Sequence, residues 1–124
     1  MTVDIAPAHL VGAGGALGAV LRHAVSQRVK ADEFPAGTLV VNVVGSFVLG
    51  LVVALGAESG VALFVGTGAC GSFTTFSSFS VETVRLWETG ERGRAVVNAA
   101  ANLAGAVAAV GLAWVLVRTL GTVT

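Results

Sequence analysis

The sequence predicts an all-α integral membrane protein with four transmembrane helices, because its few charges separate long apolar runs. Only 11% of the 124 residues are charged and 55% are hydrophobic, whereas about 25% of the residues in soluble domains are charged. Residues 5–21, 37–57, 59–81 and 95–117 contain no Lys, Arg, Asp or Glu. About 20 apolar residues cross the hydrocarbon core of a membrane. The last three runs reach that length, and the first does so if Arg22 snorkels or faces a cavity.

We expect one domain, residues 1–124, that crosses the cell membrane four times. The predicted spans cover about residues 6–28, 36–56, 60–88 and 92–119. A soluble protein with four such runs would have too little polar surface to dissolve. The formal net charge is zero, so no basic patch indicates a nucleic acid as partner. The two histidines have no partners at metal-ligand spacing, and the residues form no catalytic constellation, which predicts that the protein is not an enzyme.

The third predicted span contains the most informative stretch, GTGACGSFTTFSSFS at residues 66–80. Three glycines occur in its first six positions, and six hydroxyl residues occur in the next nine. Lipid cannot hydrogen-bond exposed backbone, so a helix interrupted at that depth must line an enclosed or watery site. We therefore expect a break at about residues 68–75, where a polar solute binds or passes. Phenylalanine ring edges are electropositive, so Phe76 and Phe79 can face an anion beside these hydroxyl groups.

Polar residues in the other predicted spans leave two interpretations open. Asn42 in the second span either forms an interhelical hydrogen bond that fixes packing or lines a pore as a hydrogen-bond donor. For Asn98 and Asn102 in the fourth span we expect interhelical hydrogen bonds. Arg22 follows Gly14 and Gly18 at four-residue spacing on one helical face. Such a face either packs closely against another helix or places a fixed positive charge at the mouth of an aqueous vestibule, where it would concentrate anions.

Three motifs in order resemble the small fluoride channels of the CrcB, or Fluc, family over essentially the whole chain. They are GGALGAVLR at residues 14–22, GTLVVNVVGSFVLG at 37–50 and GACGSFTTFSSFSVE at 68–82. The resemblance implies a fluoride-selective channel that passively exports toxic cytoplasmic fluoride. It also implies a dimer of two four-helix subunits inserted in opposite orientations, with two fluoride pathways and a third helix broken at mid-membrane.

The resemblance also assigns residues to the site. It implies a central structural sodium ion held by the backbone carbonyls of Gly71 and Thr74 from both subunits. The implied fluoride pathway comprises Asn42, Phe76, Phe79, Ser77, Ser78, Thr75 and Arg22. One residue departs from the family pattern: Ser72 replaces a glycine found in many members, so we expect less backbone freedom there and a small shift of the break. The resemblance gives Glu82 no role.

The partner and the function each have alternatives. One side of the predicted bundle holds only Arg118, while the other holds Arg28, Lys30, Arg85, Arg92 and Arg94. This bias is unusual for a protein that inserts both ways, so a heterodimer with an oppositely biased paralogue is an alternative to a homodimer. A proton-coupled drug exporter would need a carboxylate within the membrane, and residues 5–21 contain none. A non-transporting scaffold would not explain a hydroxyl-rich break beside a phenylalanine pair.

Overall fold

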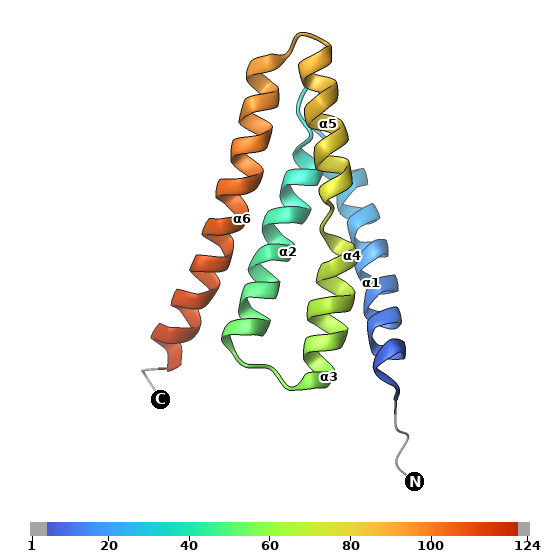
Figure 1. The fold of residues 1–124 in the computed structure, drawn as a ribbon, viewed down its shortest axis with the longest axis vertical. Helices are drawn as coiled ribbons and strands as arrows, with labels where there is room; N and C mark the ends of the chain where they lie inside the picture. The colour runs from blue at the N-terminus through green and yellow to red at the C-terminus, as the bar shows by residue number, and fades with distance from the viewer. Residues whose placement is uncertain (1–4, 122–124) are drawn as a thin grey trace.

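The computed structural model describes residues 5–121 and consists of four helical segments that lie side by side (Figure 1). The first, second and fourth segments are single helices: α1 (Pro7–Arg28), α2 (Ala36–Ala54) and α6 (Arg92–Gly121). The third segment is composite and contains α3 (Ser59–Val61), the π-helical η1 (Ala62–Cys70), α4 (Gly71–Phe73) and α5 (Phe76–Glu88). Successive segments run in opposite directions, so both ends of the described chain lie at the same end of the bundle (Figure 1).

The tight turns between segments depend on glycine and on a side-chain cap. Gly56 follows α2 with a φ of 59°, and Gly90 follows α5 with a φ of 88°. Both values fall in the left-handed region, which residues with a Cβ adopt only with strain. After the first turn, the Glu58 side chain accepts a hydrogen bond from the Val61 N–H at 3.2 Å. This cap satisfies one of the N–H groups that a helix start leaves unpaired.

Small residues bring the backbone of α1 against the third segment. Gly14 and Gly18 are buried, and a Cβ at Gly14 would overlap the Phe64 carbonyl of η1. A Cβ at Gly68 would lie 2.7 Å from the Val11 carbonyl oxygen. Of the two interpretations of this face, these contacts bear out close packing against another helix, which is the usual means by which membrane helices associate.

A second small-residue contact joins α6 to α2. Ala109 and Ala113 of α6 are buried. A Cβ at Gly50 of α2 would lie 2.9 Å from the Ala113 Cβ, and one at Gly105 would lie 2.8 Å from a Val43 methyl group. The small residues of α6 thus allow close packing against α2.

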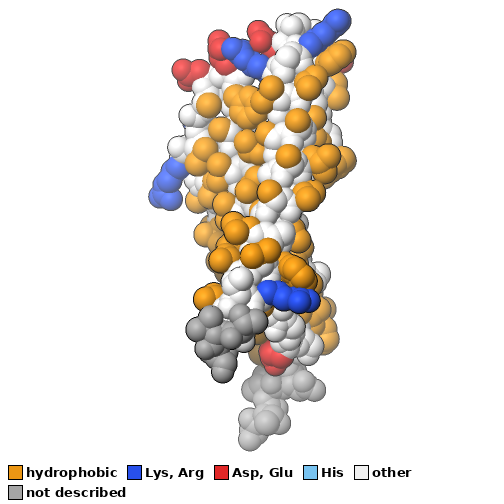
Figure 2. All heavy atoms as spheres, turned by 90° about the vertical axis from the view of Figure 1, so that its left-hand side faces the viewer, with side chains coloured by type: hydrophobic (Ala, Val, Ile, Leu, Met, Phe, Trp, Pro, Cys, Tyr) orange, Lys and Arg blue, Asp and Glu red, His pale blue; other side chains and the backbone are white. Residues whose placement is uncertain are grey.

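Two of the helices are long and apolar enough to cross a membrane individually: α2, with a mean hydropathy of 2.2, and α6, with 2.0. The other two predicted spans do not meet this standard as single helices. In α1 the glycines, both histidines and Arg22 lower the hydropathy, and the third segment is divided into shorter helices. Apolar side chains nevertheless cover the middle of the face shown in Figure 2, and charged side chains gather mainly toward its ends.

The interruption of the third segment is narrower than the predicted range of 68–75. Gly68 lies within η1, and Gly71 has helical angles, with φ −61° and ψ −34°. The chain leaves the helical conformation only at Thr74 and Thr75. The extended residues therefore lie at the C-terminal end of the expected range, and Gly68 and Gly71 stay within helices. Glycine 68 provides room for the α1 backbone, which a helical glycine can do without leaving the helix.

Candidate functional site

The helix break is formed by two extended threonines. Thr74 has φ −81° and ψ 158°, and Thr75 has φ −150° and ψ 117°. The Thr75 Oγ1 accepts a hydrogen bond from the Ser78 N–H at 3.2 Å and so caps the start of α5. The Thr74 hydroxyl donates to the Cys70 carbonyl at 2.9 Å. Threonine suits both the extended backbone and the helix cap, because its β-branched side chain favours extended conformations and its hydroxyl group caps helices.

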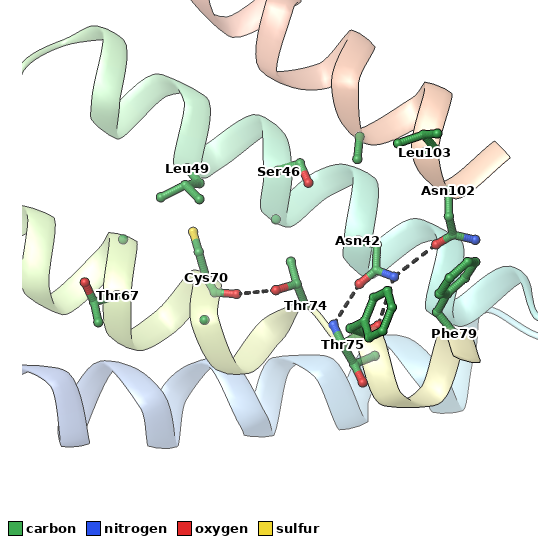
Figure 3. A pocket seen from close by; sticks show the side chains of 15 residues that line it. Asn42, Ser46, Leu49, Thr67, Cys70, Thr74, Thr75, Phe79, Asn102 and Leu103 are labelled. Carbon is green, nitrogen blue, oxygen red and sulfur yellow. Dashed lines mark hydrogen bonds between the residues drawn. The ribbon is translucent and has the colours of Figure 1, made fainter. Parts of the chain in front are cut away.

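Asn42 of α2 pairs with both polar groups of the Thr75 backbone, and it supplies the acceptor that the Thr75 N–H loses at the break. Its Oδ1 accepts from the Thr75 N–H at 2.7 Å, and its Nδ2 donates to the Thr75 carbonyl at 3.1 Å. The same Nδ2 donates to the Asn102 Oδ1 at 3.0 Å (Figure 3). A peptide group away from water is costly when unpaired, so the Asn42 carboxamide is what allows the chain to be extended here.

The same contacts change the surroundings of the two carbonyls that we expected to bind sodium. In a continuous α-helix the N–H groups of Thr75 and Ser78 would donate to the carbonyls of Gly71 and Thr74. Here they donate to Asn42 Oδ1 and Thr75 Oγ1 instead. Carbonyl oxygens without helical donors are suitable ligands for Na⁺ at a broken membrane helix. The two carbonyls therefore fit a bound cation, although the Arg22 Nη1, at 3.5 Å from the Thr74 oxygen, competes for one of them.

Arg22 of α1 contacts the break directly. Its Nη1 is 3.5 Å from the Thr74 carbonyl oxygen, and the residue is half-buried. This distance exceeds that of a strong hydrogen bond, so the contact is mainly electrostatic. The fixed positive charge lies beside the carbonyl at the break.

An open groove of about 550 Å³ lies between α2, the third segment and α6. Among the residues that line it are Asn42, Ser46, Gly71, Thr74, Thr75, Phe76, Phe79 and Asn102. Six of the nine predicted site residues are in this lining. The other three contact the break instead: Arg22 reaches Thr74, while Ser77 Oγ lies 3.4 Å from Thr75 Oγ1 and Ser78 Oγ accepts from it at 3.1 Å.

The phenylalanine pair lies at the edge of this groove. The ring centroids of Phe76 and Phe79 are 5.7 Å apart, and the ring planes are tilted by 47°. Phe76 is 80% exposed. Other apolar side chains on the outside of the bundle, such as Val53 and Leu103, are exposed to a similar extent.

The sequence analysis allowed an interhelical hydrogen bond at Asn102 but did not identify its partner, and it did not predict the contact made by Ser72. Asn102 lines the groove and accepts from Asn42, although the sequence showed only that it stacks four residues after Asn98. Ser72 remains helical, and its hydroxyl donates to the Gly15 carbonyl of α1 at 2.5 Å. The serine that departs from the family pattern thus ties the third segment to α1, just before the break.

Glu82 lies outside the groove, on the side of α5 that faces the start of α2. Its Oε1 accepts from the Thr38 hydroxyl at 2.8 Å. Its Oε2 is buried and has no hydrogen-bond partner among the described residues 5–121. The carboxylate is therefore held by one contact near the charged end of the bundle.

The fold and the site define a helical membrane protein with a polar break in one span. The family model described as "CrcB-like protein, Camphor Resistance (CrcB)" matches residues 9–114. The chain therefore belongs to the CrcB family, as the three sequence motifs predicted.

Curated relatives match the chain over nearly its full length. A protein of Haloarcula marismortui named fluoride-specific ion channel FluC 2 is 59% identical over 94% of this chain and 98% of its own. Fluoride-specific ion channel FluC 1 of Halobacterium salinarum is 55% identical over 94% of this chain and 99% of its own. Fluoride-specific ion channel FluC of Agrobacterium fabrum is 44% identical over 90% and 95%, respectively.

Proposed function

We propose that this protein is a fluoride-specific ion channel that passively exports fluoride across the cell membrane. The observation that carries the proposal is the 59% identity, over 94% of the chain, to a protein named as such a channel. The arrangement at the break supports it, because hydroxyl groups, a carboxamide and a phenylalanine pair meet there in an otherwise apolar bundle.

The residues around the break can replace the water that fluoride loses. A small and strongly hydrated anion needs successive hydrogen-bond donors along its path rather than one deep site. We assign this role to the hydroxyl groups of Ser77, Ser78 and Thr75, and to the electropositive ring edges of Phe76 and Phe79. The charge of Arg22 would raise the local concentration of anions.

Asn42 has a different part in this pathway. One of its side-chain amide donors is directed to Thr75 and the other to Asn102. Direct donation to fluoride would require one of these hydrogen bonds to open. We therefore assign Asn42 chiefly to holding the break in the conformation that presents the hydroxyl groups.

We further propose that a second copy, inverted in the membrane, covers the groove and completes the pathway. The groove at the break is open, and Phe76 in its lining is 80% exposed. A single four-helix bundle is too thin to enclose a pore, so a second copy would close the groove. The carbonyls of Gly71 and Thr74 from both copies would hold a structural sodium ion, whose charge offsets the cost of a buried anion. A paralogue with the opposite Lys/Arg bias is the alternative partner.

Fluoride release from liposomes tests the proposed function. Purified protein is reconstituted into vesicles loaded with potassium fluoride or potassium chloride, and an ion-selective electrode records efflux after valinomycin is added. We expect rapid fluoride release and no chloride release above that of protein-free vesicles. Chloride efflux as fast as fluoride efflux would refute the assignment. Crosslinking of the reconstituted protein gives the number of copies in each assembly.

A further inference from the structure

Three asparagines and one threonine form a continuous hydrogen-bonded chain through the bundle. Beyond the bond from Asn42 to Asn102, the Asn102 Nδ2 donates to the Asn98 Oδ1 at 3.0 Å. The Asn98 Nδ2 donates in turn to the Thr83 Oγ1 of α5 at 2.9 Å. Asn98 is fully buried and Asn102 is 7% exposed. We call Asn42, Asn102, Asn98 and Thr83 the amide relay.

The amide relay begins and ends on the backbone of the third segment. At one end the Thr75 N–H donates to Asn42, and at the other the Thr83 hydroxyl donates to the Phe79 carbonyl at 2.7 Å. The chain thus leaves the third segment at the break, passes through α2 and α6, and returns to α5. It connects the position of the break to the turn that carries Phe79.

The direction of every donor in the amide relay is fixed by these two ends. Because Thr83 uses its only proton on the Phe79 carbonyl, its oxygen must accept. Asn98 must then direct its NH₂ group toward Thr83 and its oxygen toward Asn102. Asn102, whose Nδ2 also donates to the Asn98 backbone carbonyl at 2.9 Å, directs its oxygen toward Asn42, whose own oxygen must face the Thr75 N–H. Both ends require the same orientation of all three carboxamides.

We propose that Asn98, Asn102 and Thr83 are positioning residues, which orient the Asn42 carboxamide so that it holds the helix break. Asparagines that only join helices would tolerate either orientation of each amide, whereas the amide relay tolerates one. The predicted effect on fluoride flux depends on the proposed function. The predicted effect on the Thr75 N–H does not, because it concerns the geometry of the break alone.

The first test compares Thr83→Val with Thr89→Val. Both threonines donate to the carbonyl four residues earlier, with Thr89 reaching Arg85 at 2.9 Å. Thr89 is exposed and outside the amide relay, so it is a matched control. Hydrogen–deuterium exchange of the purified full-length protein, measured on peptides that contain Thr75, is the readout. We expect exchange of the Thr75 amide to be about tenfold faster in Thr83→Val, because the Asn98 Nδ2 group then loses its acceptor. Exchange should be unchanged in Thr89→Val.

A double variant separates positioning from stability. Thr83→Val alone leaves a buried donor unpaired, whereas Thr83→Val with Asn98→Leu replaces both partners by apolar groups of similar shape, which is nearly neutral for stability. We expect the double variant to regain part of the lost thermal stability, since Asn102 loses the Asn98 Oδ1 but keeps the backbone carbonyl of residue 98 as an acceptor at 2.9 Å. Its Thr75 amide should still exchange about tenfold faster than in wild type, because Asn102 is then oriented only by its bond to the backbone carbonyl of residue 98 and no longer by the Asn98 side chain and Thr83. Its fluoride release should stay well below that of wild type.

The outcomes are distinct. Wild-type exchange at Thr75 in both Thr83→Val and the double variant would overturn the positioning role. Recovery of fluoride release in step with stability would also overturn it, since that result indicates a purely structural contact. If wild-type vesicles release no fluoride, the proposed function fails, and the exchange measurements still decide the role of the amide relay.

Discussion

Replacing Asn42 by leucine should disable the site while leaving the fold recognisable. Leucine has a similar shape but no polar atoms, so three hydrogen bonds are lost: those to the N–H and carbonyl of Thr75 and that to Asn102. Each buried polar group left unpaired costs about 1–3 kcal/mol. The Thr75 N–H is the group left unpaired by the break itself, and in a membrane span no water replaces its lost partner, so we use the upper value, which gives about 3 kcal/mol for the extended break.

A loss of about 3 kcal/mol corresponds to roughly a 100-fold smaller population of the native break conformation. We therefore expect Asn42→Leu to lower the initial rate of fluoride release from liposomes by about two orders of magnitude. Ser46→Ala is the control, because Ser46 lines the same groove one turn further along α2. That variant should retain most of the flux. Circular dichroism in detergent checks that both variants are helical.

Asn42→Asp provides a second comparison at the same position. Aspartate keeps an acceptor for the Thr75 N–H but loses both donors, and it places a negative charge against the oxygens of Thr75 and Asn102. We expect a loss of flux at least as large as for leucine, because the charge also repels fluoride. Wild-type flux in Asn42→Leu would refute the reasoning, since it would mean that the break does not depend on the carboxamide.

Other expectations follow from single contacts. Gly14→Ala forces a Cβ into the Phe64 backbone of η1 and should lower thermal stability by about 1–3 kcal/mol; Gly12→Ala, with no atom within 4 Å of the added carbon, is its control. Phe76→Ile should sharply reduce fluoride release without destabilising the monomer, because the ring is 80% exposed; equal release would exclude a role for the ring edge. Ser72→Ala removes the bond to α1 and should cost about 1 kcal/mol in thermal unfolding, and an unchanged midpoint would contradict this.

The helical class and the helix-packing faces are local properties, and the sequence predicts them. Charge-free runs of sufficient length indicate membrane segments whatever their neighbours are. Small residues four positions apart, such as Gly14 with Gly18 and Ala109 with Ala113, share one face of any helix. A glycine in a helix can either unwind it or let a neighbouring helix approach, and the spacing of glycines in the sequence does not decide between these two roles. Here Gly68 lies against Val11, and close packing prevails.

Tertiary structure alone decided where the helix breaks and which polar groups hold it. Asn42 is 33 residues from Thr75 and 60 from Asn102 along the chain, and no periodicity relates them. A carboxamide inside an apolar bundle must find partners wherever packing places them, so its role depends on which helices are neighbours. The sequence by itself therefore determined that polar groups gather in the third span. The packing of α2 and α6 beside that span determined that the chain opens at Thr74 and Thr75, because it places the Asn42 carboxamide where it can accept from the Thr75 N–H.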